Sequence, residues 1–186
     1  MLEMVDLRPL LGSAGVRDLL DHMDYPPPAR QAKTAAVIRE CRDHPEQPVW
    51  GAVRCGSLLG FIWLRIEGPG SAVVRQIAVH GSHRRQGIGR HMIQWAWRTH
   101  GLRALSAETD RHAVAFYRGL GFAAGSLGEK YPGTERFHCT LIHPAWASPT
   151  ESPPAAASGG QTTTTQAEST DARYQVRQAA ASDLPE

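Results

Sequence analysis

Cysteine is scarce in this sequence, and the few cysteines form no pattern that indicates a crosslink or a metal site. Cys41, Cys55 and Cys139 lie far apart, and no two of them have C-x-x-C spacing. A disulfide framework needs paired cysteines, and a structural zinc site needs clustered thiolates or imidazoles, so neither is indicated. We therefore expect reduced thiols and no bound metal.

Long apolar runs are also missing. The N-terminal stretch MLEMVDLRPLLGSAG contains Glu3, Asp6 and Arg8 where a secretion signal would be apolar. No later segment reaches the roughly 18 apolar residues that span a bilayer. The formal charge of +2 is too small to suggest nucleic-acid binding or a polybasic membrane anchor. These absences predict a soluble cytoplasmic protein whose partners include neither nucleic acid nor a membrane.

The composition of the chain changes near Pro144. The residues that follow are rich in Pro, Ala, Ser, Thr and Gly, which bury too little apolar surface to fold. We therefore predict a folded domain over residues 1–147, a disordered linker over 148–172 and a short tail over 173–186.

Within the predicted domain, strand-like and helix-like patterns alternate. Prolines end two helical patterns, and the polar pair Gly56 and Ser57 between two β-rich runs is typical of a hairpin turn. We predict strands at 5–10, 48–55, 57–67, 70–80, 102–108 and 135–143, and helices at 14–23, 29–44, 87–100 and 111–120. Three antiparallel strands that lead into strand, helix, strand, helix, strand predict a mixed α/β domain with one sheet.

The stretch VHGSHRRQGIGRHM, residues 79–92, joins a predicted strand to a predicted helix. A glycine-rich turn before a helix presents unpaired backbone N–H groups and the positive end of the helix dipole, which together favour phosphate. Arg84, Arg85 and Arg90 add positive charge. The stretch therefore predicts a phosphate-binding loop.

Three known phosphate-binding patterns compete for this loop. A P-loop needs Gly-Lys-Ser/Thr, which is not present. A dinucleotide-binding loop fits poorly, because Met92 stands where the third glycine is needed, although Glu108 falls at the ribose-binding distance. The pattern that fits is R/Q-x-x-G-x-G/A, formed by Arg84, Gly87 and Gly89.

Two segments resemble a known family. VVRQIAVHGSHRRQGIGRHMIQWA is similar to the acyl-CoA pyrophosphate segment of the GCN5-related N-acetyltransferase (GNAT) superfamily, and ETDRHAVAFYRGLGF is similar to its second signature, N-x-x-A-x-x-x-Y-x-x-x-G-F. The resemblance extends over residues 5–143. It implies a GNAT-type mixed, mostly antiparallel central sheet with helices on both faces and splayed central strands. It also implies transfer of an acetyl group from acetyl-CoA to an amine by direct attack.

The resemblance also implies where acetyl-CoA binds. The pantetheine arm would pair with backbone groups of the fourth strand, and the pyrophosphate would lie on the amides of the loop. The expected contacts are Ile77, Ala78, Val79, Arg84, Arg85, Gln86, Gly87, Ile88, Gly89, Arg90 and Asp110. Asp110 stands where the family usually has Asn, so its charge could weaken binding, and the alternative is that it caps the next helix.

Tyr117 stands at the tyrosine of the second signature, so the resemblance implies that it acts as the general acid for the leaving thiolate. Spacing alone favours a core position, because Tyr117 lies on an amphipathic helical pattern beside Phe116. A backbone N–H near Val79 would meet the oxyanion.

The base that removes the amine proton is less clear from the sequence. Relatives often place a glutamate on the fourth strand, where this chain has Arg75 and Gln76, or on the fifth, where it has Leu105. Glu108 is the nearest carboxylate and the first candidate, with a plain surface role as its alternative. His80 and His112 are further candidates that would act through water.

The segment GEKYPGTERF lies where the family often builds its acceptor pocket, so Glu129, Tyr131, Glu135 and Arg136 are candidates for substrate binding. The expected acceptor is a small-molecule or peptide amine. His80 and His83 in HGSH could suggest a metal pair, but no further ligands cluster with them, so loop histidines are favoured.

The tail YQVRQAAASDLPE resembles the start of many of these acetyltransferase domains, with V/I-R followed by alanine or threonine and then D-L-P. It predicts the truncated start of a second GNAT domain, and the alternative is a disordered tail. A second domain or a second copy of the chain is the expected protein partner. The alternative function is a non-catalytic acyl-CoA-binding or scaffolding half of such a tandem protein.

Overall fold

A computed structural model of the chain describes residues 1–21, 27–131 and 133–144. The predicted linker at 148–172 and the tail at 173–186 lie outside these residues, as do the last two residues of the helix predicted at 14–23. None of the helices in the described residues is long and apolar enough to cross a membrane.

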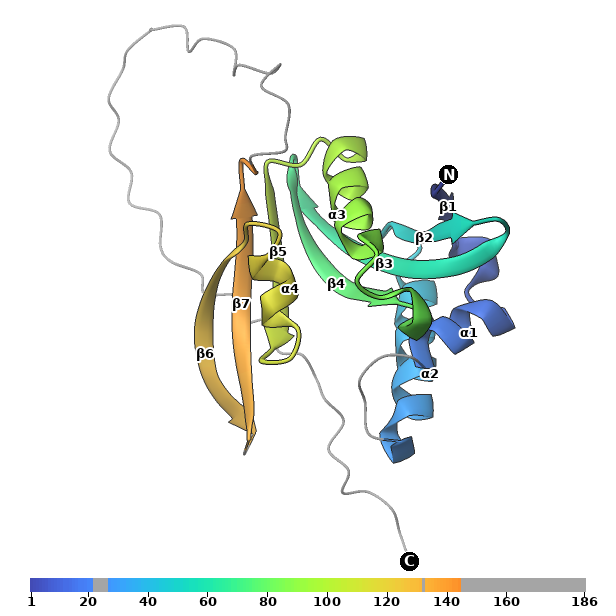
Figure 1. The fold of residues 1–186 in the computed structure, drawn as a ribbon, viewed down its shortest axis with the longest axis horizontal. Helices are drawn as coiled ribbons and strands as arrows, with labels where there is room; N and C mark the ends of the chain where they lie inside the picture. The colour runs from blue at the N-terminus through green and yellow to red at the C-terminus, as the bar shows by residue number, and fades with distance from the viewer. Residues whose placement is uncertain (22–26, 132, 145–186) are drawn as a thin grey trace, which may run out of the picture. The chain divides into compact units, whose positions relative to one another are not determined.

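One sheet of seven strands organises the described residues, in the order β1-β2-β3-β4-β5-β7-β6 (Figure 1). The strands are β1 (Glu3–Asp6), β2 (Val49–Arg54), β3 (Ser57–Gly68), β4 (Ser71–Val79), β5 (Ala104–Asp110), β6 (Ala123–Tyr131) and β7 (Thr134–Ile142). Neighbouring strands are antiparallel except β4 and β5, which are parallel. The mixed, mostly antiparallel sheet predicted from the sequence is confirmed.

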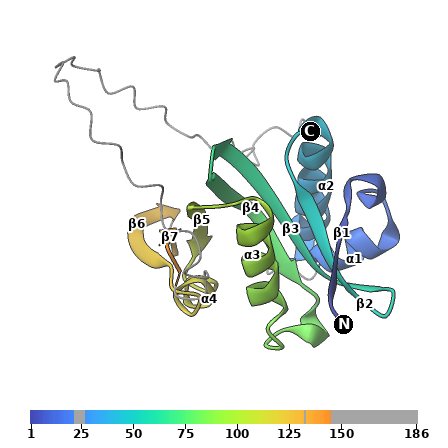
Figure 2. The same cartoon turned by 90° about the horizontal axis from the view of Figure 1, so that it is seen from above.

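Helices cover both faces of this sheet (Figure 2). They are α1 (Ala14–Asp21), α2 (Pro27–Asp43), α3 (Ile88–Thr99) and α4 (Val114–Arg118), with two short 3-10 turns, η1 (Arg8–Leu10) and η2 (Gly81–His83). The middle of β3 is apolar at consecutive positions because both of its sides are covered. Phe61 and Trp63 pack in the core beneath α1 and α2, whereas Ile62 and Leu64 pack in the core beneath α3 and α4.

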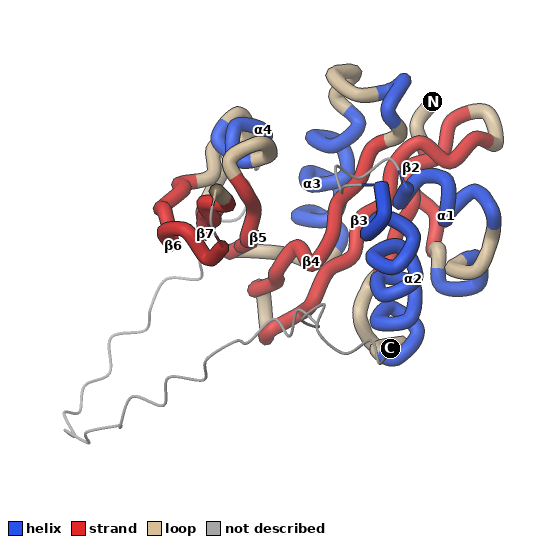
Figure 3. Tube along the Cα trace, turned by 90° about the horizontal axis from the view of Figure 1, so that it is seen from below, coloured by secondary structure: helices blue, strands red, loops and turns tan. Residues whose placement is uncertain are grey.

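The central strands β4 and β5 separate partway along their length. Their pairing runs from Ser71 opposite Ala104 to Val74 opposite Ala107, and among the described residues no pairing continues beyond that point. The β3–β4 register shifts there, with Gln76 opposite Trp63 but Val74 opposite Leu64, so Arg75 is the extra residue of a β-bulge. The bulge bends β4 away from β5 (Figures 1 and 3). The predicted splay is therefore confirmed.

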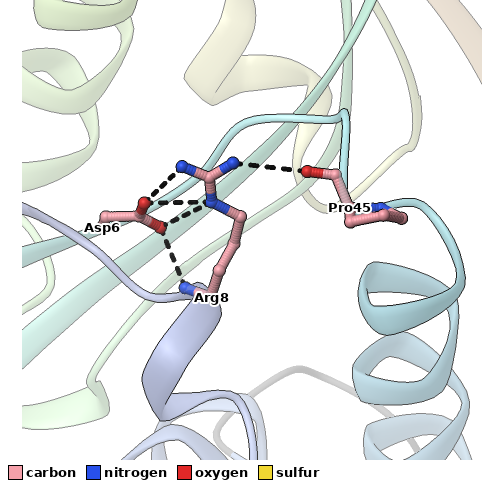
Figure 4. Close-up of polar contacts among 3 residues, drawn as sticks. All are labelled: Asp6, Arg8 and Pro45. Atoms are coloured by element: carbon pink, nitrogen blue, oxygen red, sulfur yellow. Dashed lines mark hydrogen bonds and ion pairs between the residues drawn. The ribbon is translucent and has the colours of Figure 1, made fainter.

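The first strand is shorter than predicted. It ends at Asp6, and η1 takes the place of the rest of the predicted 5–10 strand. Pro9 has no N–H for a strand ladder, and the carboxylate of Asp6 accepts the backbone N–H of Arg8 at 2.9 Å, which turns the chain. Arg8 also binds the Asp6 carboxylate through its guanidinium and donates to the carbonyl of Pro45 (Figure 4). These contacts fix the end of β1 against the loop that follows α2.

Two further predictions from the sequence were wrong in detail. The hairpin turn between β2 and β3 consists of Cys55 and Gly56 rather than Gly56 and Ser57, and both turn residues have positive φ (50° and 76°) as in a type I′ turn. The edge strand β6 was not predicted, because its sequence AAGSLGEKY contains two glycines and lacks apolar alternation.

Candidate functional site

The last part of β4 has an open backbone edge where β5 has turned away. The N–H of His80 donates to the carbonyl of Leu59 on β3 at 2.9 Å. Because backbone groups alternate along an antiparallel pair, Ala78 also faces β3, while Ile77 and Val79 present their N–H and C=O groups to the splay. Of the three predicted backbone contacts, Ile77 and Val79 are therefore placed to pair with an inserted chain, and Ala78 is turned away from it.

The predicted phosphate loop follows this edge and ends at the N-terminus of α3. Arg85 and Gly87 both have positive φ (64° and 80°), and Gly87 is the N-cap residue of α3. No side chain caps this helix start, so its first backbone N–H groups remain available to a ligand. Arg84, Arg85, Gln86, Gly87 and Arg90 are exposed, whereas Ile88 is buried in the core. The loop thus combines accessible amides, a helix dipole and positive charge, and Ile88 can contribute only backbone to a ligand.

Two contacts join this loop to α4, which carries the second predicted motif. Nη2 of Arg90 donates to the carbonyl of Gly119 at 2.9 Å. Gly89 lies against the ring of Phe116 so closely that a Cβ at this position would be 2.8 Å from a ring carbon. The structure therefore brings together the two segments that carry the family resemblance.

Tyr117 lies inside the core beneath α4 with 4% of its surface exposed. Its ring makes edge contacts with Phe116 at 5.1 Å and Phe122 at 5.2 Å between centroids. Burial raises the pKa of the Tyr117 phenol well above its ordinary value, with a smaller contribution from Cys139. A phenol with a raised pKa stays protonated at neutral pH, as a proton donor must.

Glu108 and Asp110 continue β5 beyond its last pair with β4. Glu108 is exposed, stands opposite His138 on β7, and faces away from the core that holds Ala107 and Tyr117. The carboxylate of Asp110 accepts the backbone N–H groups of His112 and Ala113 at 2.9 and 3.1 Å. Asp110 therefore forms the turn before α4, although the N-cap residue of that helix is Ala113 and no side chain caps it.

The residues predicted to bind substrate lie on the hairpin of β6 and β7. Glu129 is opposite Glu135, Arg136 is opposite Gly128, and Tyr131 ends β6 opposite Thr134. Glu135 accepts a hydrogen bond of 2.6 Å from Ser126, and Glu129 accepts the N–H of Gly133 at the turn. Glu129 and Glu135 therefore face each other across the hairpin, and Lys130 and Arg136 balance their formal charge within the same segment.

One group of polar side chains was not recognised as a unit from the sequence. Nδ1 of His80 and Nδ1 of His83 each lie 2.9 Å from Oγ of Ser82, and Nε2 of His80 is 3.6 Å from a carboxylate oxygen of Asp18. The spacing of His80, Ser82 and His83 in HGSH is the sequence signal that could have identified these three residues as a group. Asp18 could not have been added, because it lies on α1, far away in the sequence.

The model of the acetyltransferase (GNAT) family matches residues 16–122. No curated protein matches the sequence. Among the many solved structures that are similar to the chain, three illustrate the match, each over 76% of its length.

The first is an aminoglycoside 6'-N-acetyltransferase complexed with coenzyme A, with 18% identity, 96% of that chain covered and a TM-score of 0.63. The second is the aminoglycoside 6'-N-acetyltransferase from Enterococcus faecium, with 19% identity, 96% of that chain covered and a TM-score of 0.62. The third is the ribosomal-protein-S18-alanine N-acetyltransferase from Escherichia coli, with 19% identity, 94% of that chain covered and a TM-score of 0.60. At these identities, the three structures show that the fold is shared.

Proposed function

This chain belongs to the acetyltransferase (GNAT) family, and from that premise we propose that it transfers an acetyl group from acetyl-CoA to an amine by direct attack. One observation carries the proposal. Three features converge: the open edge of β4, the uncapped N-terminus of α3 and the helix that carries Tyr117. The hydrogen bond from Arg90 to the carbonyl of Gly119 joins the N-terminus of α3 to the end of that helix. A strand edge, a phosphate site and a proton donor are the three parts that transfer from a thioester requires.

Acetyl-CoA is the acyl donor in this proposal, and the loop residues fit its phosphates. The amides from Arg84 to Arg90 would hold the pyrophosphate, with Arg84 and Arg85 supplying charge. Gly87 lets the backbone turn at positive φ, and Ile77 and Val79 would pair with the pantetheine arm. Asp110 adjoins the same end of β5 but uses its carboxylate in the turn before α4. We expect it to shape the site through that turn.

Chemistry in the site requires a proton for the leaving sulfur and stabilisation of the developing oxyanion. We assign the proton to the hydroxyl of Tyr117, whose raised pKa keeps it protonated. The N–H of Val79, at the open edge of β4, is the donor for the oxyanion. The N–H of Val79 lies on β4, and Tyr117 lies on α4, which covers one face of the sheet.

The acceptor amine must lose a proton, and Glu108 is the carboxylate that the sequence favours for this step. It is the first residue of β5 beyond the last pair with β4, and it is exposed on the face away from Tyr117. A negative charge at this point attracts an ammonium group. The histidines that follow β4 are a second source of a base on the same face.

The acceptor itself is proposed to be a small-molecule or peptide amine. The similar structures include enzymes named for an aminoglycoside and for a ribosomal-protein alanine, which present primary amines. In this chain the facing carboxylates Glu129 and Glu135 of the β6–β7 hairpin would attract a cationic amine, while Tyr131 and Arg136 would contact other groups of the acceptor.

A second candidate function is a non-catalytic acyl-CoA-binding or scaffolding half of a tandem protein. The observation that favours it is the deep burial of Tyr117 within an aromatic cluster, which is also the arrangement of a purely structural tyrosine. The binding loop would serve both functions equally.

Incubation of the full chain with acetyl-CoA and a panel of primary amines separates the two functions. Release of CoA thiol in step with a mass increase of the amine supports the transferase. Binding of acetyl-CoA without acetylation of any amine, including aminoglycosides and peptides with free N-termini, supports the non-catalytic function.

A further inference from the structure

The point where β4 and β5 separate carries charged side chains on one face of the sheet. Val74 and Ala107 form the last pair of the two strands, which we call the vertex, and both belong to the core beneath α3 and α4. Arg75 and Glu108 are the next residues of the two strands. Because side chains alternate along a strand, Glu108 points to the opposite face, which is the face of α1 and α2.

Two contacts place Arg75 on the same face as Glu108. Nη2 of Arg75 donates to Oε2 of Glu40 on α2 at 3.2 Å, and its guanidinium carbon lies 5.1 Å from the centroid of the Trp63 ring, in the core beneath α1 and α2. The side chain of Arg75 nevertheless keeps 23% of its surface exposed, and that of Glu40 keeps 47%. An oriented and accessible guanidinium therefore stands at the vertex.

The β-bulge adds a second polar side chain beside Arg75. Gln76 is directly opposite Trp63 on β3, so its side chain lies on the face of α1 and α2 as well. Across the splay, Glu108 is exposed, and its side chain forms no hydrogen bond or ion pair with the described residues. This face of the vertex thus presents a cation and an amide from β4 and an anion from β5.

An acceptor can reach the vertex from this face. The core beneath α3 and α4 closes the other face, where Tyr117 is buried. The core beneath α1 and α2 contains residues of β2, β3 and β4 but, in the part of the chain that the structure describes, none of β5, β6 or β7. The path over β5 leads past Glu108, with Arg75 on the far side of the splay.

Arg75 is also close enough to the reacting group to bind the acceptor. In the function proposed above, the pantetheine arm enters from the loop after β4 and runs along Val79 and Ile77 toward the vertex. Its acyl end then lies between Val79 and Arg75, which are separated by at most about 13 Å at the rise of a strand. An extended arginine side chain and a small acceptor together span this distance.

We propose that the acceptor is an amino acid, whose amine attacks the thioester while its carboxylate binds Arg75. The proposal rests on the acetyltransferase function proposed above and names its substrate class. A carboxylate matches the planar fork of a guanidinium, which can donate two parallel N–H bonds to it. Glu108, across the splay, attracts the ammonium group of the same molecule.

The reaction leaves the carboxylate of the acceptor unchanged. The ammonium group releases one proton to become an amine, the acetyl group then replaces one amine hydrogen, and the sulfur of CoA leaves as a thiol. Recognition of the carboxylate therefore acts on the affinity for the acceptor and on its orientation, and adds no chemical step.

The competing explanation is a purely structural ion pair. Arg75 and Glu40 would then fasten α2 to the bulge of β4 and have no contact with the acceptor. In our proposal, Glu40 neutralises Arg75 in the absence of acceptor, and its half-exposed carboxylate yields the guanidinium to the incoming one. The two explanations differ in what they predict when each partner is removed separately.

Two variants that break this ion pair separate recognition from structure. With the full chain, acetyl-CoA and the twenty common amino acids, we expect Arg75→Gln to raise KM for the preferred amino acid about 10- to 100-fold. The affinity for acetyl-CoA, measured by calorimetry, should change little. Glu40→Gln removes only the present partner of Arg75 and should keep KM within about threefold of the unaltered chain.

Carboxamides of the same amino acids are the matched substrates. They keep the amine and the side chain but lack the negative charge. The unaltered chain should favour the amino acid over its carboxamide in kcat/KM, and Arg75→Gln should lower this preference about 10- to 100-fold. The lower amine pKa of a carboxamide cancels, because the preference is compared between two proteins.

A milder variant keeps the test informative if Arg75→Gln does not fold. Arg75→Lys keeps the charge but loses the fork, so KM for the preferred amino acid should rise about 3- to 10-fold. The preference of the unaltered chain for amino acids over carboxamides needs no variant at all.

Failure of this proposal can be told apart from failure of the proposed function. If Arg75→Gln and Glu40→Gln change KM alike, or if carboxamides are acetylated as well as amino acids, Arg75 does not bind the acceptor, although the chain is still an acetyltransferase. If acetyl-CoA binds and no amine of either kind is acetylated, the acetyltransferase function is contradicted, and the assignment of an amino acid acceptor is overturned with it.

Discussion

Nη2 of Arg90, in the first turn of α3, donates a 2.9 Å hydrogen bond to the carbonyl oxygen of Gly119, just after α4. The bond closes the last turn of the helix that carries Tyr117 onto the loop that presents backbone amides to phosphate. The binding of one substrate group and the placement of the proton donor are thus mechanically connected.

Replacing Arg90 with alanine removes this bond and one positive charge beside the phosphate site. We expect Arg90→Ala to lower the free energy of unfolding by about 1 kcal/mol and to weaken acetyl-CoA binding roughly tenfold. Urea unfolding and calorimetric titration measure the two effects. Arg98→Ala, which removes the same charge from the far end of α3, is the control and should leave the affinity for acetyl-CoA nearly unchanged.

Gly89 provides the close approach between α3 and α4. A Cβ at this position would lie 2.8 Å from the ring of Phe116, so Gly89→Ala must displace this ring or α4 itself. We expect a loss of about 1–3 kcal/mol in the free energy of unfolding and weaker acetyl-CoA binding. Gly15→Ala is the matched control, because a Cβ added to Gly15 in α1 would meet no neighbouring atom within 4 Å. Alanine at position 15 should stabilise α1 by roughly 0.5–1 kcal/mol. If Gly15→Ala and Gly89→Ala lower the free energy of unfolding by the same amount, the close contact of Gly89 with Phe116 is not the cause.

Tyr117→Phe removes the proposed proton donor and keeps the ring within its aromatic cluster. We expect kcat for acetyl transfer to fall about 100-fold while the affinity for acetyl-CoA changes less than about twofold. Because burial raises the pKa of the phenol above its ordinary 10.0, the unaltered enzyme should lose no activity to ionisation of Tyr117 between pH 7 and 9. Unchanged turnover in the variant would make Tyr117 a purely structural residue.

His100 makes the free energy of unfolding depend on pH in the acidic range, independently of catalysis. It follows the last turn of α3, with its ring 6.2 Å from that of Trp95, and burial lowers the pKa of its imidazole from 6.5. The unfolded chain therefore binds a proton more readily than the folded one, so stability is lost as pH falls below about 6.5. We expect the free energy of unfolding to fall less between pH 7.5 and 5 in His100→Gln than in the unaltered chain. Equal slopes would mean that His100 does not contribute.

The sequence was sufficient for the parts of the site that depend on neighbours in the chain. Gly87 and Gly89 predicted the loop because a turn at positive φ and a close helix contact both demand glycine. The turn that Asp110 forms before α4 is local in the same way, since it involves only the next three residues.

What the sequence did not predict depends on register and on distant contacts. Alternation of backbone groups turns Ala78 toward β3, although it lies between two residues that face the splay. The pairing of His80 with Asp18 needs α1 to pack over the end of β4, which no local pattern encodes. The edge strand β6 is held by its register with β7 rather than by its own propensity.

Isothermal titration of the full chain with acetyl-CoA and with free CoA tests the central claim most directly. The account predicts saturable binding of both ligands at about one molecule per chain, with affinity reduced in Arg90→Ala and retained in Arg98→Ala. If neither ligand binds at millimolar concentration, the loop before α3 is not a CoA site, and the acetyltransferase function proposed for this chain is contradicted.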